Sequence, residues 1–179
     1  MAVLRLHLLG SPVLRERSRE VVAVDDEVRA FVDQMFETMD ANKGVGLAAN
    51  QVGKAVRVAV IDADEKRITL INPRIIAASD EKEAEEEGCL SIPDIFAEVT
   101  RPARVTMEAL DRDGKPYTLE AEGLLARAIQ HEIDHLDGVL FLDHLGLMKR
   151  QSMLRKYKRE HPEGRQVQEH PTEPAPAGE

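Results

Sequence analysis

The stretch that decides the fold is GLLARAIQHEIDHL, which runs from Gly123 to Leu136. Its apolar residues recur at the spacing that gives an α-helix one buried face. They are Leu124, Leu125, Ala128 and Ile129. Gly138 follows at a position where helices commonly end. We therefore predict a buried helix over residues 123–136.

Segments rich in β-branched residues precede this helix. We predict a hairpin of residues 56–61 (VRVAVI) and 68–72 (ITLIN), joined by a polar turn. A second hairpin is predicted from residues 104–110 (RVTMEAL) and 116–122 (PYTLEAE), because an Asp-Gly pair between them favours a tight reversal. Since the strands come before the buried helix, the order favours an α+β fold with mainly antiparallel sheets over alternating βαβ units.

Two further helices are expected, one on each side of these elements. The N-terminal helix covers residues 25–39, with Asp25 and Asp26 as candidate caps. Its apolar face comprises Val28, Phe31, Val32, Met35 and Met39. The C-terminal helix covers residues 147–159 and has a strongly basic face. We interpret that face as solvated rather than as a contact with nucleic acid or the ribosome, although a transient ribosome contact stays open.

The composition favours one domain followed by a tail. Of 179 residues, 42% are hydrophobic, which suffices for a single core over residues 1–160. Residues 161–179 include four prolines and one large aliphatic side chain, Val167, so we predict a disordered tail. The formal net charge of −9 disfavours stable nucleic-acid binding.

The chain is expected to be cytoplasmic. Its beginning, MAVLRLHLLG, is interrupted by Arg5 and His7 and lacks the apolar core of a signal peptide. We find no run of membrane-spanning length and expect no membrane association. A single cysteine permits no intramolecular disulfide, so an oxidising compartment would offer no advantage.

The predicted buried helix carries the motif His131-Glu132-Ile133-Asp134-His135, an H-E-x-x-H pattern. Residues four apart lie on one helix face about one turn apart, so both imidazoles can bind one ion. Glu132 can take a proton from a metal-bound water, whose pKa falls from ~15.7 towards ~7, and deliver it to the leaving amine. The motif therefore predicts a metal-dependent hydrolase.

The third metal ligand is open at this point, because a catalytic zinc-type site usually has three protein ligands. Cys89 is a candidate, since a thiolate binds metals strongly, but a lone cysteine is more often an inert buried residue. Several carboxylates and the remaining histidines also qualify. For the histidines we favour solvated or structural roles; they are His7, His144, His161 and His170.

Three blocks of sequence together resemble the peptide deformylase family. They are GVGLAANQ (44–51), EGCLS (87–91) and QHEIDHLDG (130–138), and the resemblance covers roughly residues 1–160. It implies hydrolytic removal of the formyl group from the N-terminal formylmethionine of nascent polypeptides, with release of formate. It also implies a monomer with one divalent ion, physiologically Fe²⁺, that Zn²⁺, Ni²⁺ or Co²⁺ can replace.

The resemblance assigns roles to individual residues. Cys89, His131 and His135 become metal ligands, and Glu132 becomes the general base and acid for a metal-bound hydroxide that attacks the formyl carbon. Gln51 and the backbone N–H of Leu90 would stabilise the oxyanion, although Gln51 taken alone suggests a turn residue. Substrate contacts are expected at Val45, Gly46, Gly88, Leu124 and Ala128. The glycines among them, with Gly44, would let an extended peptide approach the chain closely.

Three residues depart from the best-known bacterial pattern and bear on peptide preference. Phe96 stands where some family members have an arginine that contacts the peptide. Glu85 and Arg127 stand where apolar residues line the pocket.

Two other functions remain as alternatives. A metallopeptidase would use the same helix on internal amide bonds, but the cysteine block has no role in an ordinary H-E-x-x-H protease. A structural metal module with a fourth protein ligand would have no use for Glu132 beside a ligand.

Overall fold

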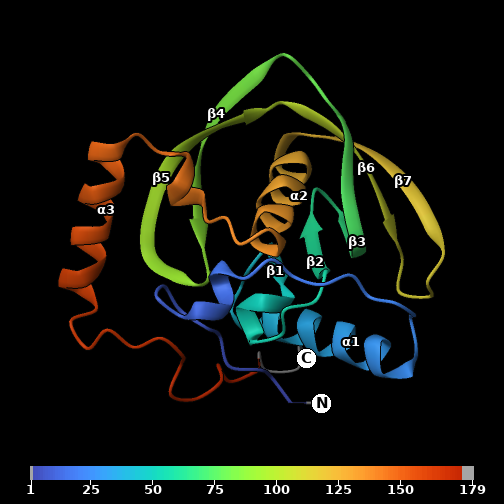
Figure 1. The fold of residues 1–179 in the computed structure, drawn as a ribbon, viewed down its shortest axis with the longest axis horizontal. Helices are drawn as coiled ribbons and strands as arrows, with labels where there is room; N and C mark the ends of the chain where they lie inside the picture. The colour runs from blue at the N-terminus through green and yellow to red at the C-terminus, as the bar shows by residue number, and fades with distance from the viewer. Residues whose placement is uncertain (1, 175–179) are drawn as a thin grey trace.

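The computed structural model describes residues 2–174, with one helix at the centre and strands arching around it (Figure 1). The helices are α1 (Asp26–Ala41), α2 (Gly123–Leu136) and α3 (Leu147–Glu160). The strands are β1 (Gly46–Ala48), β2 (Val58–Ala63), β3 (Lys66–Ala78), β4 (Lys82–Cys89), β5 (Ile92–Pro102), β6 (Arg104–Leu110) and β7 (Pro116–Glu122). The central helix is α2, so the prediction of a buried helix with a helix on each side in sequence is confirmed.

Two antiparallel sheets make up the β structure. The larger has the strand order β1-β2-β3-β6-β7, and the smaller is the β4-β5 pair. The β2–β3 hairpin turns at Asp64 and Glu65, which have φ of 51° and 62°. The second predicted hairpin is β6–β7, with the expected boundaries. The predicted α+β class with mainly antiparallel sheet is therefore confirmed.

Strand β2 explains how the larger sheet acquires a helix on each face. Its side chains alternate between the two faces, as the pleat of a strand requires. Val58 and Val60 pack in a cluster with α1, whereas Ala59 and Ile61 pack in a cluster with α2. The predicted apolar face of α1 lies in the first cluster, and the Asp25 carboxylate caps this helix by accepting from the Val28 N–H at 2.9 Å.

Strands β1, β4 and β5 are not among the elements predicted from the sequence, and β3 is longer than predicted. Strand β4 (KEAEEEGC) contains four glutamates and no β-branched residue, so its composition argues against a strand. It forms because residues 82–88 pair in continuous register with β5. Strand β3 runs on to Ala78 past register shifts after Ile71 and Ile75, where an irregular ladder obscures the pattern.

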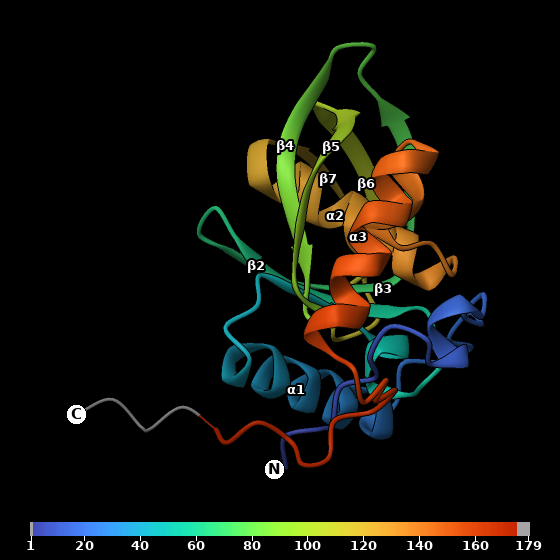
Figure 2. The same cartoon turned by 90° about the vertical axis from the view of Figure 1, so that its left-hand side faces the viewer.

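The chain after Glu160 departs from the expected unstructured tail. Val167 forms an antiparallel bridge with His7, and the Leu8 N–H donates to the Gln166 carbonyl at 2.8 Å. Figure 2 shows this last segment running beside the N-terminal one. Local composition could not indicate the pairing, because the partner lies at the other end of the chain. Residues 175–179 of the predicted tail lie outside the described residues.

No helix within residues 2–174 is both long enough and apolar enough to cross a bilayer.

The two tyrosines give a test of packing, because the chain contains no tryptophan. Burial, with the charge of Asp111, raises the pKa of Tyr117 to about 12, and burial also raises the pKa of Tyr157. Unfolded tyrosines titrate near ~10. In the folded protein both tyrosine pKa values lie above the unfolded value. The contribution of these tyrosines to the free energy of unfolding is therefore fully present below pH ~10 and is lost as the pH rises through the folded pKa values.

We therefore expect the ultraviolet absorbance of native protein to show little tyrosinate at pH ~10, where denatured protein is about half ionised. Tyr117→Phe should remove the later-ionising group. Native and denatured titration curves that coincide would contradict the burial of both side chains.

Candidate metal centre

Helix α2 is held in place at both ends. It begins at Gly123, whose φ of 61° suits glycine, and the Asp64 carboxylate accepts from the Leu125 N–H at 3.0 Å. It ends before Gly138, whose φ is 76°. A Cβ at Gly138 would lie 2.6 Å from the Arg15 carbonyl oxygen, so a side chain there has no room. The predicted boundaries of this helix are confirmed.

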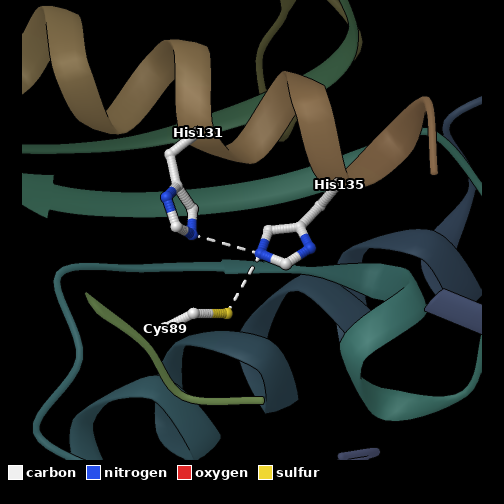
Figure 3. Close-up of side chains that lie close together, drawn as sticks. All are labelled: Cys89, His131 and His135. Atoms are coloured by element: carbon white, nitrogen blue, oxygen red, sulfur yellow. Dashed lines mark hydrogen bonds between the residues drawn. The ribbon is translucent and has the colours of Figure 1, made fainter. Parts of the chain in front are cut away.

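His131 and His135 extend from α2 towards Cys89, which ends β4 (Figure 3). The two Nε2 atoms are 3.1 Å apart, and Cys89 Sγ lies 3.3 Å from His135 Nε2. All three donor atoms lie within 4.8 Å of one another. Ligands of one tetrahedral ion at ordinary Zn–N and Zn–S bond lengths are ~3.3–3.6 Å apart. Two imidazoles and a thiol at this spacing fit a divalent metal ion.

The other histidines do not join this group anywhere in residues 2–174. His144 Nε2 instead lies 2.8 Å from Asp134 Oδ2, and His7 Nδ1 lies 2.8 Å from Ser11 Oγ. His161 Nε2 lies 3.4 Å from an Asp94 carboxylate oxygen, and His170 is exposed. Of the open candidates for a third ligand, the fold therefore brings Cys89 to the two histidines.

Glu87 orients His131 through the ring nitrogen that does not face the other donor atoms. Its Oε1 lies 2.9 Å from His131 Nδ1. Burial favours the neutral form of Glu87, but hydrogen bonds from His131 and Arg101 outweigh it and hold the pKa of this carboxyl well below its usual range. An ionised carboxylate can only accept, so Nδ1 carries the hydrogen and Nε2 presents its lone pair to a metal. Glu87 lies within the EGCLS block, but the sequence alone predicts no role for it.

Glu87 also accepts hydrogen bonds from two arginines, the buried Arg101 and the partly buried Arg127. Arg101 donates to both of its carboxylate oxygens, at 2.6 and 2.9 Å, and Arg127 donates to Oε2 at 2.6 Å. Arg101 further donates to Asp134 at 2.8 Å. The positive charges of these arginines compensate the buried negative charge of Glu87, which accepts the hydrogen bond from His131.

His135 is buried and stays neutral. Burial, together with the nearby His131, lowers the pKa of His135 well below its usual value. Asn50 holds the helix backbone here by donating from Nδ2 to the His135 carbonyl oxygen. A neutral imidazole is the form that binds a metal.

Glu132 faces the cavity beside the candidate ligands and is 3% exposed. Its Oε2 has no hydrogen-bond partner among the described residues, which leaves it free to accept a proton. Burial raises the pKa of Glu132 to about 7. A Cβ at Gly46 would lie 2.6 Å from Glu132 Oε1, so glycine at this position makes room for the carboxylate.

Gln51 lies in the short 3₁₀ turn Ala49–Val52, which follows β1. Its Oε1 accepts from the Ala48 N–H at 2.9 Å, which orients its Nε2 towards Ser91 Oγ at 3.0 Å and Cys89 Sγ at 3.5 Å. Leu90 lines the same cavity, and its side chain occupies the space that a Cβ at Gly44 would need. The structure thus brings both predicted oxyanion residues to the thiol.

A cavity of about 640 Å³ opens onto these residues. Its lining includes Cys89, His131 and Glu132. All five residues predicted to contact substrate also line it: Val45, Gly46, Gly88, Leu124 and Ala128. Val45 and Leu124 are each 47% exposed, so they present apolar surface to the cavity instead of filling the core.

Comparison with known proteins identifies the family. The family model described as polypeptide deformylase matches residues 3–151. The chain belongs to the peptide deformylase family. It is 48% identical over 164 residues to a peptide deformylase of Brucella suis, covering 89% of this chain and 94% of that one. It is 52% identical over 151 residues to one of Chromohalobacter salexigens, covering 83% and 89% of the two chains.

Solved structures agree with this assignment. Peptide deformylase of Ehrlichia chaffeensis in complex with actinonin superposes with a TM-score of 0.86 at 41% identity, over 89% of this chain and 98% of that chain. The Thermotoga maritima enzyme gives a TM-score of 0.80 at 40% identity, over 82% and 99%. The chain is thus a hydrolase of a metal-dependent family.

The three departures from the better-known deformylase pattern have different positions. Phe96 is 59% exposed, lines the cavity and packs on Gly88, where an added Cβ would lie 2.6 Å from its ring. Arg127 lines the cavity too, but its guanidinium is held by Glu87 and by the Val99 carbonyl at 2.9 Å. Glu85 is exposed and is not among the lining residues, so the expectation that it faces the pocket is wrong.

Replacing Glu87 tests its role behind His131. We expect Glu87→Gln to lower metal affinity by ~10- to 100-fold, because a neutral amide neither fixes the imidazole tautomer nor compensates the two arginines. Competition with a metal chelator measures the change. Glu85→Gln, on an exposed position of the same strand, is the matched control. Equal metal affinity in the two variants would show that Glu87 does not contribute to metal binding.

Proposed function

We propose that this chain hydrolyses the N-formyl group of the N-terminal formylmethionine of newly synthesised polypeptides, yielding formate and a free amine. The main support is the position of Glu132, which lies in the cavity wall beside the Cys-His-His donor set. The chain that holds this arrangement belongs to the peptide deformylase family. The cavity volume of about 640 Å³ is in the range that holds a small ligand or a short peptide.

Cys89, His131 and His135 would hold the metal ion. We propose Fe²⁺ as the physiological ion, with Zn²⁺, Ni²⁺ or Co²⁺ as substitutes, because imidazole and thiolate donors suit all of them. When bound, a divalent ion supplies Lewis-acid chemistry that lowers the pKa of a coordinated water from ~15.7 towards ~7.

Glu132 moves the proton. Its buried carboxylate accepts a proton from the attacking water, whose oxygen forms the new bond to the formyl carbon. The carbon–nitrogen bond then breaks, and Glu132 returns the proton to the leaving nitrogen. The absence of a Cβ at Gly46 supports this role, because it leaves the carboxylate room in the cavity wall.

Gln51 and the backbone N–H of Leu90 would stabilise the oxygen that becomes negative during the attack. The Ala48 N–H already fixes the Gln51 carboxamide, so little reorganisation is needed at the moment of reaction. Loss of one such preorganised donor typically costs ~2.7–4 kcal/mol of transition-state stabilisation.

The peptide would bind as an added strand. Strand β1 is an edge of the larger sheet, and Gly46 within it lines the cavity, as does Gly88 of β4. An extended peptide can form backbone hydrogen bonds along such an edge. Its methionine side chain would contact Leu124, Ala128 and Val45, which form apolar parts of the lining.

We further propose a cytoplasmic monomer whose residues 1–160 form the catalytic domain and whose contact with the ribosome is at most transient. Basic residues recur along α3, at Lys149, Arg150, Arg155, Lys156, Lys158 and Arg159, but the net charge of −9 opposes stable binding to RNA.

Formate release tests the proposed function. Anaerobically purified protein loaded with Fe²⁺ or Ni²⁺ should release formate from formyl-Met-Ala-Ser, and chelation should abolish release until metal is restored. An unblocked Met-Ala-Ser peptide should stay intact, which separates this activity from that of a metallopeptidase. Absence of formate with metal fully bound would disprove the proposal.

Two substitutions separate metal binding from proton transfer. Glu132→Ala should retain metal and lower kcat by ~100-fold or more, because general acid–base catalysis typically contributes 10²–10⁴-fold. Cys89→Ala should lose metal affinity itself. Metal content and formate release, measured on the same samples, distinguish the two. Near-native turnover by Glu132→Ala would show that another group transfers the proton.

A further inference from the structure

The C-terminal segment extends the wall of the catalytic cavity. It pairs with the N-terminal segment through the Val167–His7 bridge, and the Gln168 N–H donates to the Leu6 carbonyl at 2.9 Å. Gln168 lines the same cavity as Cys89 and Glu132, although it lies outside the residues 3–151 that match the family model. This part of the wall is therefore a feature of this chain beyond the matched family region.

The same segment holds a second part of the cavity lining. Thr172 Oγ1 donates to Asn42 Oδ1 at 2.6 Å, and Asn42 also lines the cavity. Asn42 begins the stretch 42–46, which ends at Gly46 against the Glu132 carboxylate. Thr172 therefore contacts this stretch at the end opposite Gly46, and Gln168 lies next to Thr172, with its Nε2 3.5 Å from Thr172 Oγ1.

The side chain of Gln168 has hydrogen-bonding capacity to spare. Its Oε1 accepts from the Leu6 N–H at 2.9 Å, which fixes the plane of the amide. Its Nε2 has two hydrogens and makes one long contact, 3.5 Å from Thr172 Oγ1. An oriented amide N–H at a cavity wall is suited to a peptide carbonyl oxygen.

We propose that residues 166–172 form a specificity wall of the enzyme, in which Gln168 donates a hydrogen bond to the main chain of the formylated peptide beyond its methionine. The proposal rests on the proposed function. The contact selects for peptide length and leaves the chemical step untouched, because the hydrogen bonds of Gln168 go to Leu6 and Thr172 and none goes to Glu132 or a candidate metal ligand.

Peptides of two lengths test this wall. For Gln168→Glu, we expect KM for formyl-Met-Ala-Ser-Val to rise by ~3- to 10-fold, the range for one hydrogen bond, with kcat and the KM for formyl-Met-Ala unchanged. Glutamate keeps an oxygen for the Leu6 N–H and removes the N–H donor, so a purely structural role would not produce this split. Gln168→Ala should give the same split.

His170→Ala is the matched control, because His170 is exposed and lies on the same segment without lining the cavity. Thermal unfolding of each variant checks that the fold is retained. Unchanged KM for the longer peptide, or an equal rise for both peptides, would overturn the inference alone. Failure of the wild-type protein to release formate from either peptide would overturn the proposed function and this inference with it.

Discussion

The site depends on one buried carboxylate. Glu87 of β4 accepts hydrogen bonds from Arg101 of β5 and from Arg127 and His131 of α2, so a single side chain joins the smaller sheet to the central helix. A buried ionised carboxylate is costly unless it is paired, and here the pairing itself sets the distance between sheet and helix. Because Cys89 lies two residues after Glu87 on the same strand, the contact that orients His131 also brings the thiol to it.

The candidate active site lies where the two sheets meet. The larger sheet contributes Gly46 at its edge strand and, just after it, the 3₁₀ turn that carries Gln51, while the smaller sheet contributes Gly88 and Cys89. Helix α2 packs on the larger sheet, is joined to the smaller one by side-chain hydrogen bonds such as Arg127 to Glu87, and supplies the histidines and Glu132. Residues of all three elements line one cavity. Such a site suits a peptide substrate that binds in an extended conformation and is hydrolysed at one end. Backbone hydrogen bonds would position the peptide while the buried groups act on its terminus.

The two chain ends add a layer outside this arrangement. The N-terminal segment contacts the site beside Cys89, since the His7 N–H donates to the Gln51 carbonyl at 2.7 Å and the Leu9 N–H to the Ser91 carbonyl at 2.8 Å. The C-terminal segment then pairs with the outer edge of residues 6–8. A segment that composition marks as unable to form a core is thus ordered by backbone pairing, and it reaches the cavity through Gln168.

The sequence by itself determined what depends on local spacing. The apolar period of residues 123–136 sets the helix, the four-residue interval sets two imidazoles on one face, and the three sequence blocks indicate the family and single out Cys89 and Gln51. Only the tertiary structure decided the rest. Strand β4 forms against its own composition because β5 pairs with it, Glu87 gains its role from three partners distant in sequence, and Gln168 reaches the cavity by pairing with the opposite end of the chain. These features arise from long-range pairing and from compensation of buried charge, which local periodicity does not encode.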